Sequence, residues 1–277
     1  MKDRVWFITG TSTGFGRCLV DGLLQRGLRV VATARDVSKP SGIPKVENLL
    51  RVQLDVTAPE TITKAVAAAL HQFGRIDVLV NNAGFGLIGA IEEVSDAEAR
   101  RLFDTNVFGL LNMTRAVLPV LRAQASGTVV NMGSIAGLVA VAGGGIYGAT
   151  KFAVEGIGDA LALEVGPLGI KVMTVEPGPF RTDAHGRSLV LAEGVIDAYS
   201  ETSGARRVAL EKQSGGQPGD PDKAAALIID VVQSGDVPAR LPLGGVAIDL
   251  ARAKFANVLA NFDRVEDRSR ATSKTVK

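Results

Sequence analysis

The chain of 277 residues is poor in reactive side chains, with one cysteine and two histidines. A single cysteine, Cys18, excludes an internal disulfide, and its place in a helical pattern predicts a small core residue. This composition suits a reducing cytoplasm, where we expect the protein to reside. His71 and His185 stand far apart, and no cluster of His, Cys and Asp has metal-ligand spacing, so no metal site is predicted.

Strong net charge and long apolar runs are also missing. A formal net charge of +2 argues against nucleic acid as the main partner. No apolar run reaches the length of a membrane-spanning helix, and the first one is too short for a signal-peptide core. The hydrophobic fraction of 46% predicts a soluble globule with a sizeable core. We therefore expect a small-molecule partner, without nucleic acid and without a membrane span.

Apolar runs alternate with helical patterns along most of the chain. The runs are continuous instead of alternating with polar residues, as in a parallel sheet that is buried on both faces. They lie at residues 5–9, 28–34, 49–54, 76–80, 128–132 and 170–175, with an edge strand at 238–243. The sequence therefore predicts an α/β fold, a doubly wound Rossmann-like parallel sheet of about seven strands with helices on both faces.

Capping signals delimit several helices. Ser95–Glu98 is a capping box that opens a long helical region towards Ala125, with a bend or break expected at Pro119. Thr57–Glu60 resembles a second capping box, and Asp220 is the N-cap of a later helix. We interpret residues 1–277 as a single dinucleotide-binding and catalytic domain. It carries a mobile insert at about 184–220 and a polar, solvated tail from about 264.

A glycine loop follows the first predicted strand. Gly10, Gly14 and Gly16 have the spacing G-x-x-x-G-x-G, and a helical pattern follows them. Such a loop directs backbone N–H groups and the positive end of a helix dipole at a pyrophosphate. The alternative is a glycine-lined turn that packs helix on strand, but the position after the first strand favours phosphate binding.

The ends of the next strands offer contacts for an adenosine. Arg35 follows the second strand and can pair with a 2′-phosphate, which favours NADP, although the neighbouring Asp36 can turn towards the ribose, which leaves NAD open. Asp55 and Val56 end the third strand, where the carboxylate either accepts from adenine or forms an Asx turn. The fourth strand ends in Asn81-Asn82-Ala83-Gly84, where a glycine permits close approach of a flat ligand.

Ser134, Tyr147 and Lys151 form the candidate catalytic set. Tyr147 and Lys151 are four residues apart, which on a helix places them on one face. A nearby ammonium lowers the pKa of a phenol, and such a phenol beside a hydroxyl group can move a proton to or from a carbonyl oxygen. By itself the Tyr-x-x-x-Lys pattern is more often a solvated pair.

Taken in order, these motifs resemble the short-chain dehydrogenase/reductase family over residues 4–183. The shared features are the TGxxxGxG loop, the Asn-Asn-Ala-Gly turn, Asn106, Ser134 thirteen residues before Tyr147, Lys151, and a Pro177-Gly178 turn with Thr182 four residues after Gly178. Gly133 stands where a second serine is common in the family, which should affect loop packing more than catalysis.

The resemblance implies a role for each matching residue. Tyr147 would be the general acid or base, Lys151 would lower its pKa and hold the nicotinamide ribose, Ser134 would bind the substrate oxygen, and Asn106 would hold a water. The residues implied to contact the cofactor are Gly10, Ser12, Thr13, Gly14, Phe15, Gly16, Arg35, Asp55, Val56, Asn82, Ala83, Gly84, Tyr147, Lys151, Pro177, Gly178 and Thr182. Relatives commonly form homodimers or homotetramers, and the apolar residues Phe152, Val154 and Leu161 fit either such an interface or burial within the chain.

The predicted activity is NADP(H)-dependent interconversion of a carbonyl and an alcohol on an apolar or amphipathic small molecule. The candidate substrate residues are mostly apolar: Phe85, Leu138, Val141, Phe180 and His185. One alternative is a non-catalytic NADP-binding sensor or scaffold, which has no need of the Ser-Tyr-Lys set. A serine hydrolase is the other, but Met132 replaces the first glycine of G-x-S-x-G before Ser134.

Overall fold

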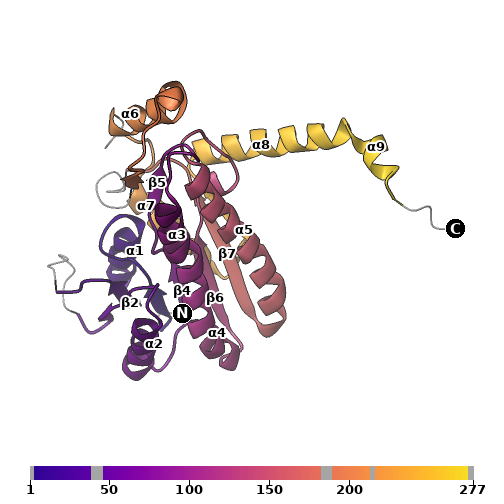
Figure 1. Ribbon diagram of the computed structural model, residues 1–277. Coiled ribbons are helices and arrows are strands. Elements are labelled where there is room, and N and C mark those ends of the chain that lie inside the picture. The colour runs from indigo at the N-terminus through magenta and orange to yellow at the C-terminus, as the bar shows by residue number, and fades with distance from the viewer. Residues whose placement is uncertain (1–2, 39–45, 182–188, 213–215, 274–277) are drawn as a thin grey trace.

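The computed structural model describes residues 3–38, 46–181, 189–212 and 216–273 (Figure 1). Its centre is a sheet of seven parallel strands in the order β3-β2-β1-β4-β6-β7-β9. The strands are β1 (Val5–Ile8), β2 (Arg29–Ala34), β3 (Leu49–Gln53), β4 (Val78–Asn81), β6 (Gly127–Met132), β7 (Ile170–Pro177) and β9 (Arg240–Leu243). The predicted doubly wound parallel sheet is therefore confirmed, and its strand order reverses between β1 and β4.

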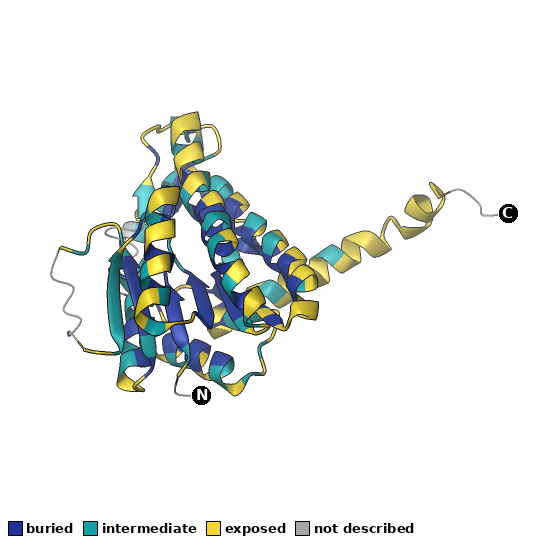
Figure 2. Cartoon of the chain, turned by 90° about the horizontal axis from the view of Figure 1, so that it is seen from below, coloured by how far each residue is buried: buried dark blue, intermediate teal, exposed yellow. Residues whose placement is uncertain are grey.

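Helices cover both faces of this sheet, and each face has its own apolar core. One face packs on α1 (Gly14–Gln25) and α7 (Pro221–Ser234), and the other on α2 (Pro59–Phe73), α4 (Gly109–Ala123) and α5 (Gly145–Val165). Successive strand residues point to opposite faces, so Trp6 joins the first core and Phe7 the second. Figure 2 shows the buried strands between the partly exposed helices.

The helical region after Ser95 begins as predicted but is built differently. The Ser95–Glu98 capping box is present at the start of α3 (Asp96–Phe103). A π-helical turn, Asp104–Phe108, then leads into α4. Of the bend or break predicted at Pro119, the break does not occur, because α4 continues through this proline to Ala123. Its flanking residues Val117 and Leu121 are fully buried, so packing against the sheet holds the helix together there.

The second predicted capping box is also wrong. The N-cap of α2 is Ala58, and its side chain makes no capping hydrogen bond. Thr57 instead donates from its backbone N and from Oγ1 to Asp55 Oδ1, at 2.9 and 2.7 Å. This is the Asx turn that the sequence left as an alternative for Asp55. The predicted N-cap at the start of α7 is confirmed, since Asp220 accepts from the backbone N of Asp222 and Lys223.

The carboxyl-terminal helices leave the body of the molecule. Helix α8 (Gly245–Asp263) begins at the sheet edge and, with α9 (Glu266–Arg270), projects away from the core (Figure 1). Apart from Ala247, which is fully buried, the residues of α8 and α9 are exposed or half-buried (Figure 2). Within the described residues, no helix has the length and apolar character needed to cross a membrane.

A second, small sheet lies beside the carboxyl edge and was not predicted. Strand β5 (Gly86–Ile88) pairs in parallel with β8 (Leu189–Leu191), which belongs to the predicted insert. Three further helical segments follow in the insert, namely a 3-10 turn at Asp197–Tyr199, a π turn at Ser200–Gly204 and α6 (Ala205–Lys212). The described part of the insert therefore has regular structure.

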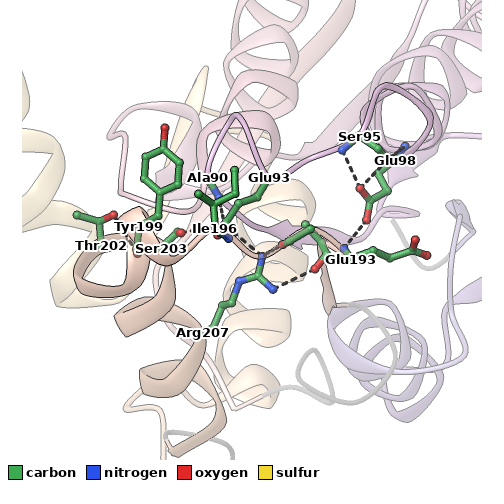
Figure 3. Close-up of polar contacts among 12 residues, drawn as sticks. Ala90, Glu93, Ser95, Glu98, Glu193, Ile196, Tyr199, Thr202, Ser203 and Arg207 are labelled. Atoms are coloured by element: carbon green, nitrogen blue, oxygen red, sulfur yellow. Dashed lines mark hydrogen bonds and ion pairs between the residues drawn. The ribbon is translucent and has the colours of Figure 1, made fainter.

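Glu93 fastens this insert to the body. The carboxylate accepts from the backbone N of Ala90 at 2.7 Å and of Ile196 at 3.1 Å, and from Ser203 Oγ at 2.9 Å (Figure 3). Arg207 Nη2 also donates to it at 3.2 Å. These bonds, led by the two backbone N–H groups, lower the pKa of Glu93 to about 2. We call Glu93, Ala90, Ile196, Ser203 and Arg207 the Glu93 latch.

We predict that Glu93→Gln loosens the segment 189–212. The amide loses the negative charge that the N–H donors and Arg207 stabilise, so amide hydrogen exchange in this segment should speed up while exchange in β1 and β4 stays unchanged. The folded pKa lies below the unfolded one, so this stabilisation is present above about pH 4.5 and disappears as the pH falls towards about 2. The effect should therefore be equal at about pH 6 and pH 8.

The matched control is Glu201→Gln. Glu201 is an exposed carboxylate within the same segment. Equal acceleration of exchange in both variants would contradict the latch.

Candidate functional site

The candidate site lies at the carboxyl edge of the sheet, where the strand order reverses. The loops after β1, β4 and β6 meet there because parallel strands end at the same edge. Thr9 directly follows β1 and connects the loops after β1 and β4, since its Oγ1 accepts from the backbone N of Asn82 and of Ala83, each at 2.9 Å. The fold therefore brings the glycine loop, the Asn-Asn-Ala-Gly turn and the Ser-Tyr-Lys set to one place.

The glycine loop is packed so closely that side chains are excluded. Gly10 has φ of +70°, and a Cβ there would lie 2.9 Å from Ala83 Cα. A Cβ on Gly16 would lie 2.4 Å from the Gly10 carbonyl oxygen. Helix α1 starts at Gly14 without an acidic residue in its first turn, and the N-cap Thr13 makes no side-chain hydrogen bond to the helix among the described residues. A bare helix start behind such a loop fits a pyrophosphate.

Asparagines hold the neighbouring loops. Asn82 Nδ2 donates to the carbonyl oxygens of Thr9 and Gly10, each at 2.9 Å, which ties the two loops together. Asn106 lies in the π turn and binds the backbone of Phe85. Its Oδ1 accepts from the Phe85 backbone N at 3.0 Å, and its Nδ2 donates to the Phe85 carbonyl oxygen at 2.9 Å. Asn106 Nδ2 also donates to Thr150 Oγ1 at 3.2 Å. Asn106 thus links the turn after β4 to α5.

Ser134, Tyr147 and Lys151 lie together, as the spacing predicted. Ser134 follows β6, and its Oγ accepts from the Ala136 N at 3.1 Å. Its side chain also hydrogen-bonds Tyr147, which is on the first turn of α5. Lys151 is one turn further, with Nζ 5.8 Å from the centre of the Tyr147 ring and 2.7 Å from the Met132 carbonyl oxygen to which it donates.

The pKa values of Tyr147 and Lys151 differ from the expectation. Burial raises the pKa of the Tyr147 phenol, and its hydrogen bond with Ser134 acts in the opposite direction. Burial lowers the pKa of Lys151 to about 8, against an opposing effect of Glu155. The expectation that the pKa of Tyr147 lies below its ordinary value is therefore wrong for this structure, because desolvation of the phenol dominates. At neutral pH the site holds a neutral phenol beside an ammonium group.

The part of the candidate cofactor site that was expected to bind the adenosine lies where β2 and β3 end. Arg35 follows β2 and is exposed, with its carbonyl oxygen accepting from Gln53 Nε2 at 3.0 Å. Asp36 Oδ1 accepts from the backbone N and Oγ of Ser38, at 3.0 and 2.6 Å, so this oxygen is engaged in a turn. Asp55 is half-buried in its Asx turn, and Val56, next to it, is buried. Arg35 thus leaves its side chain exposed at this edge.

The turn after β7 lies at the same edge. Gly178 donates from its N to the Leu243 carbonyl oxygen at 3.1 Å, and a Cβ there would lie 3.3 Å from the Ala247 N. Pro177 is buried at the end of β7. Two predicted residues, Thr182 and His185, lie outside the described residues. Gly133 has a packing reason, since a Cβ would meet Glu155 Oε1 and the Val175 carbonyl oxygen at 2.9 Å each.

A small apolar cluster forms the wall beside Tyr147. Phe85 belongs to it as predicted, and β5, α3, β8 and α5 contribute further members. The cluster contains Leu87, Leu102 and Ala192, with Phe85, Val94, Ile146, Tyr147 and Val190 packed against it.

The other predicted substrate residues have mixed surroundings. Leu138 is buried and Val141 is exposed. Phe180 packs edge-on against Phe15 of the glycine loop, with ring centres 5.2 Å apart, and its ring fills the space beside Gly219. Phe180 is therefore a packing residue of the loop in this structure.

Two hollows of the described surface differ in position. One of about 90 Å³ lies between the apolar wall and α3, lined by Phe85, Leu87, Glu98, Arg101, Val190, Leu191 and Glu193. A larger one of about 460 Å³ lies beside Arg29 and Phe73, where β2 begins and α2 ends, which is the amino edge of the sheet. Only the smaller hollow adjoins the candidate site.

Comparison with known proteins agrees with this geometry. The family model described as short chain dehydrogenase matches residues 4–189. Oxidoreductase BOA17 of Botryotinia fuckeliana is 36% identical over 94% of this chain and 95% of its own, and a 3-ketodihydrosphingosine reductase of Bacteroides thetaiotaomicron is 37% identical over 88% and 89%. A short-chain dehydrogenase structure from Streptomyces avermitilis superposes with a TM-score of 0.89 at 40% identity, covering 98% of this chain and 99% of the other. The chain therefore belongs to the short-chain dehydrogenase/reductase family of oxidoreductases.

Proposed function

We propose that this protein is an NADP(H)-dependent oxidoreductase that interconverts a carbonyl and an alcohol on an apolar or amphipathic small molecule. The observation that carries the proposal is the hydrogen-bonded pair of Ser134 and Tyr147 beside the Lys151 ammonium, at the edge of a glycine-lined loop. A bound nicotinamide dinucleotide would supply or accept the hydride. The protein has to hold the substrate and move the proton.

The state of each side chain favours reduction of a carbonyl. Tyr147 is protonated at neutral pH, because burial raises its pKa, and so it can donate to a carbonyl oxygen that gains negative charge. Ser134 Oγ hydrogen-bonds Tyr147 and is placed to bind the same oxygen. Lys151 carries a positive charge at neutral pH and stabilises the phenolate as it forms. The proton thus moves from the Tyr147 hydroxyl to the substrate oxygen.

Relatives and the apolar wall support the substrate class. The curated relatives include a 3-ketodihydrosphingosine reductase, and a human retinol dehydrogenase 8 is 36% identical over 67% of this chain. Both names describe lipid-like substrates. The wall of Phe85, Leu87 and Val190 beside Tyr147 is suited to such a chain. Turnover restricted to highly polar carbonyls would contradict this proposal.

We predict that Tyr147→Phe lowers kcat for carbonyl reduction about 10²- to 10⁴-fold, the usual contribution of a positioned general acid. NADPH affinity, measured by nicotinamide fluorescence, should change little. The matched control is Tyr199→Phe, which removes the other tyrosine of the chain. Tight NADPH binding without turnover over a broad carbonyl panel would favour the alternative of a non-catalytic sensor.

NADP as the cofactor is proposed from Arg35. A solved structure of ElxO with NADP bound is 27% identical to this chain, with a TM-score of 0.73 over 90% of this chain and all of the other. In this chain the exposed Arg35 guanidinium follows β2, and Asp36 is engaged with Ser38. These observations support pairing of Arg35 with a 2′-phosphate.

We predict that Arg35→Ala raises the Kd for NADPH about 10- to 100-fold, because loss of a charge-assisted hydrogen bond typically weakens binding by this factor. The Kd for NADH should stay within about twofold, because NADH lacks the phosphate. Arg29→Ala is the matched control, since Arg29 starts the same strand at the opposite edge of the sheet. If wild type and Arg35→Ala bind both nucleotides equally well, then Asp36 or the backbone reads the ribose.

A homo-oligomer is proposed from two exposed apolar surfaces. Val154 and Leu161 are buried in this chain's own core, so only Phe152 of the three candidate α5 residues is available, with 45% of its surface exposed. Helix α8 adds an apolar stripe with 3-4 spacing, which is the pattern that packs helix on helix. The stripe consists of Ile248, Ala251, Phe255, Val258 and Phe262.

We predict that the double variant Phe255→Ser, Phe262→Ser lowers the oligomeric mass in sedimentation velocity. The two side chains are 50% and 63% exposed, and a second copy of the chain would cover them. The control is Ala253→Ser with Ala260→Ser, which changes exposed α8 residues outside the stripe. A monomeric wild type would contradict the proposed homo-oligomer.

A further inference from the structure

Two buried carboxyl groups lie behind Lys151 and take no direct part in the proposed reaction. Glu155 is one turn after Lys151 on α5 and is 5% exposed. Glu176, near the end of β7, is 1% exposed. Arg240 Nε lies within 3.4 Å of an oxygen of each group, so the two carboxyl groups lie close together. Two buried carboxyl groups that share one site disfavour double ionisation, which favours a proton on one of them.

The surroundings supply too little positive charge for two ionised groups. Arg240 Nε lies 3.3 Å from Glu155 Oε2 and 3.4 Å from Glu176 Oε1. The same arginine also pairs with Asp159, from Nη2 to Oδ2 at 2.7 Å. Lys151, one turn before Glu155 on α5, interacts electrostatically with Glu155. The single guanidinium group of Arg240 therefore pairs with three carboxyl groups.

Hydrogen bonding gives the same answer. Within the described part of the chain, Glu155 Oε1, Glu155 Oε2 and Glu176 Oε1 accept no hydrogen bond from any donor group. A buried carboxylate without donors is costly. A proton between the two groups provides the missing donor.

Glu155 and Lys151 approach the same peptide unit. Lys151 Nζ donates to the Met132 carbonyl oxygen at 2.7 Å, and the next residue, Gly133, has no room for a Cβ because Glu155 Oε1 would lie 2.9 Å from it. The Glu155 carboxyl group thus lies behind the peptide that holds the ammonium. Its negative charge opposes the effect of burial on Lys151.

We propose that Glu155 and Glu176 share one proton, and that this acid pair, acting through Glu155, maintains the positive charge of Lys151. Glu155 is then a positioning residue for the reaction, and that part of the inference rests on the function proposed above. The shared proton itself stands on the geometry alone.

The first test measures the shared proton without any activity. Burial, and then the negative charge of Glu155, raises the pKa of Glu176 from 4.5 to about 8. The stabilisation by this proton is complete below the unfolded pKa and is lost as the pH rises to about 8. Urea denaturation should therefore show the midpoint of Glu176→Gln rising relative to wild type between about pH 5 and pH 8.

The matched control for this test is Glu164→Gln, which removes an exposed carboxylate from the same helix. Its midpoint should keep a constant distance from wild type over the same pH range. A constant distance for Glu176→Gln as well would overturn the shared proton.

The second test measures the charge of Lys151 through the pH profile of kcat. Glu155→Gln removes the carboxyl group that opposes burial of Lys151, so the alkaline limb of kcat should move down by about one pH unit, while KM changes little. Glu176→Gln leaves Glu155 as a carboxylate beside Arg240. The alkaline limb of kcat for this variant should therefore lie at the same pH as in the wild type or at a higher pH.

The outcomes separate the two proposals. If the alkaline limb of kcat moves equally in Glu155→Gln and Glu164→Gln, or moves in neither variant, the positioning role of Glu155 is overturned. If no carbonyl or alcohol is turned over by the wild type, the proposed function fails, and the urea experiment still decides whether the proton is shared.

Discussion

The site depends on one buried charge, the Lys151 ammonium held by the Met132 carbonyl oxygen at 2.7 Å. An ammonium group with 9% exposure is costly unless polar groups surround it. Here the end of β6 supplies the carbonyl oxygen, α5 supplies Glu155, and the Tyr147 ring lies 5.8 Å away. The positions of β6, α5 and β7 relative to one another are therefore part of the proposed chemistry.

The parallel sheet makes this arrangement possible because all its strands end at one edge. Backbone oxygens and side chains from β1, β4, β6 and β7 then converge without any long loop. Thr9 and Asn82 bind the first two loops to each other through four hydrogen bonds. On the outer side, the Glu93 latch holds the insert that contributes Val190 and Ala192 to the apolar wall. The end of β6 and the helix α5 thus position Ser134, Tyr147 and Lys151, and the latched insert completes the apolar wall beside Tyr147.

Local patterns predicted the sheet, the glycine loop and the Tyr147–Lys151 pair, because each depends on residues close in sequence. The π turn that carries Asn106 was missed, since periodicity does not distinguish one wide turn within a helix. The β5–β8 pair and the Glu93 latch were missed because they join residues about one hundred positions apart. The raised pKa of Tyr147 was missed for a similar reason, as burial is a property of the assembled wall.

The proposed chemistry requires Lys151 to be a buried ammonium at neutral pH, and the titration of Lys151 itself tests this. The ¹⁵N resonance of Lys151 Nζ, assigned by its absence in Lys151→Arg, reports the protonation state across the pH range. We expect a midpoint at about 8, lowered by burial from 10.5 against the opposing effect of Glu155. A midpoint at the ordinary value would mean that the amine is solvated. A neutral amine at pH 7 would remove the charge on which the proposed mechanism depends.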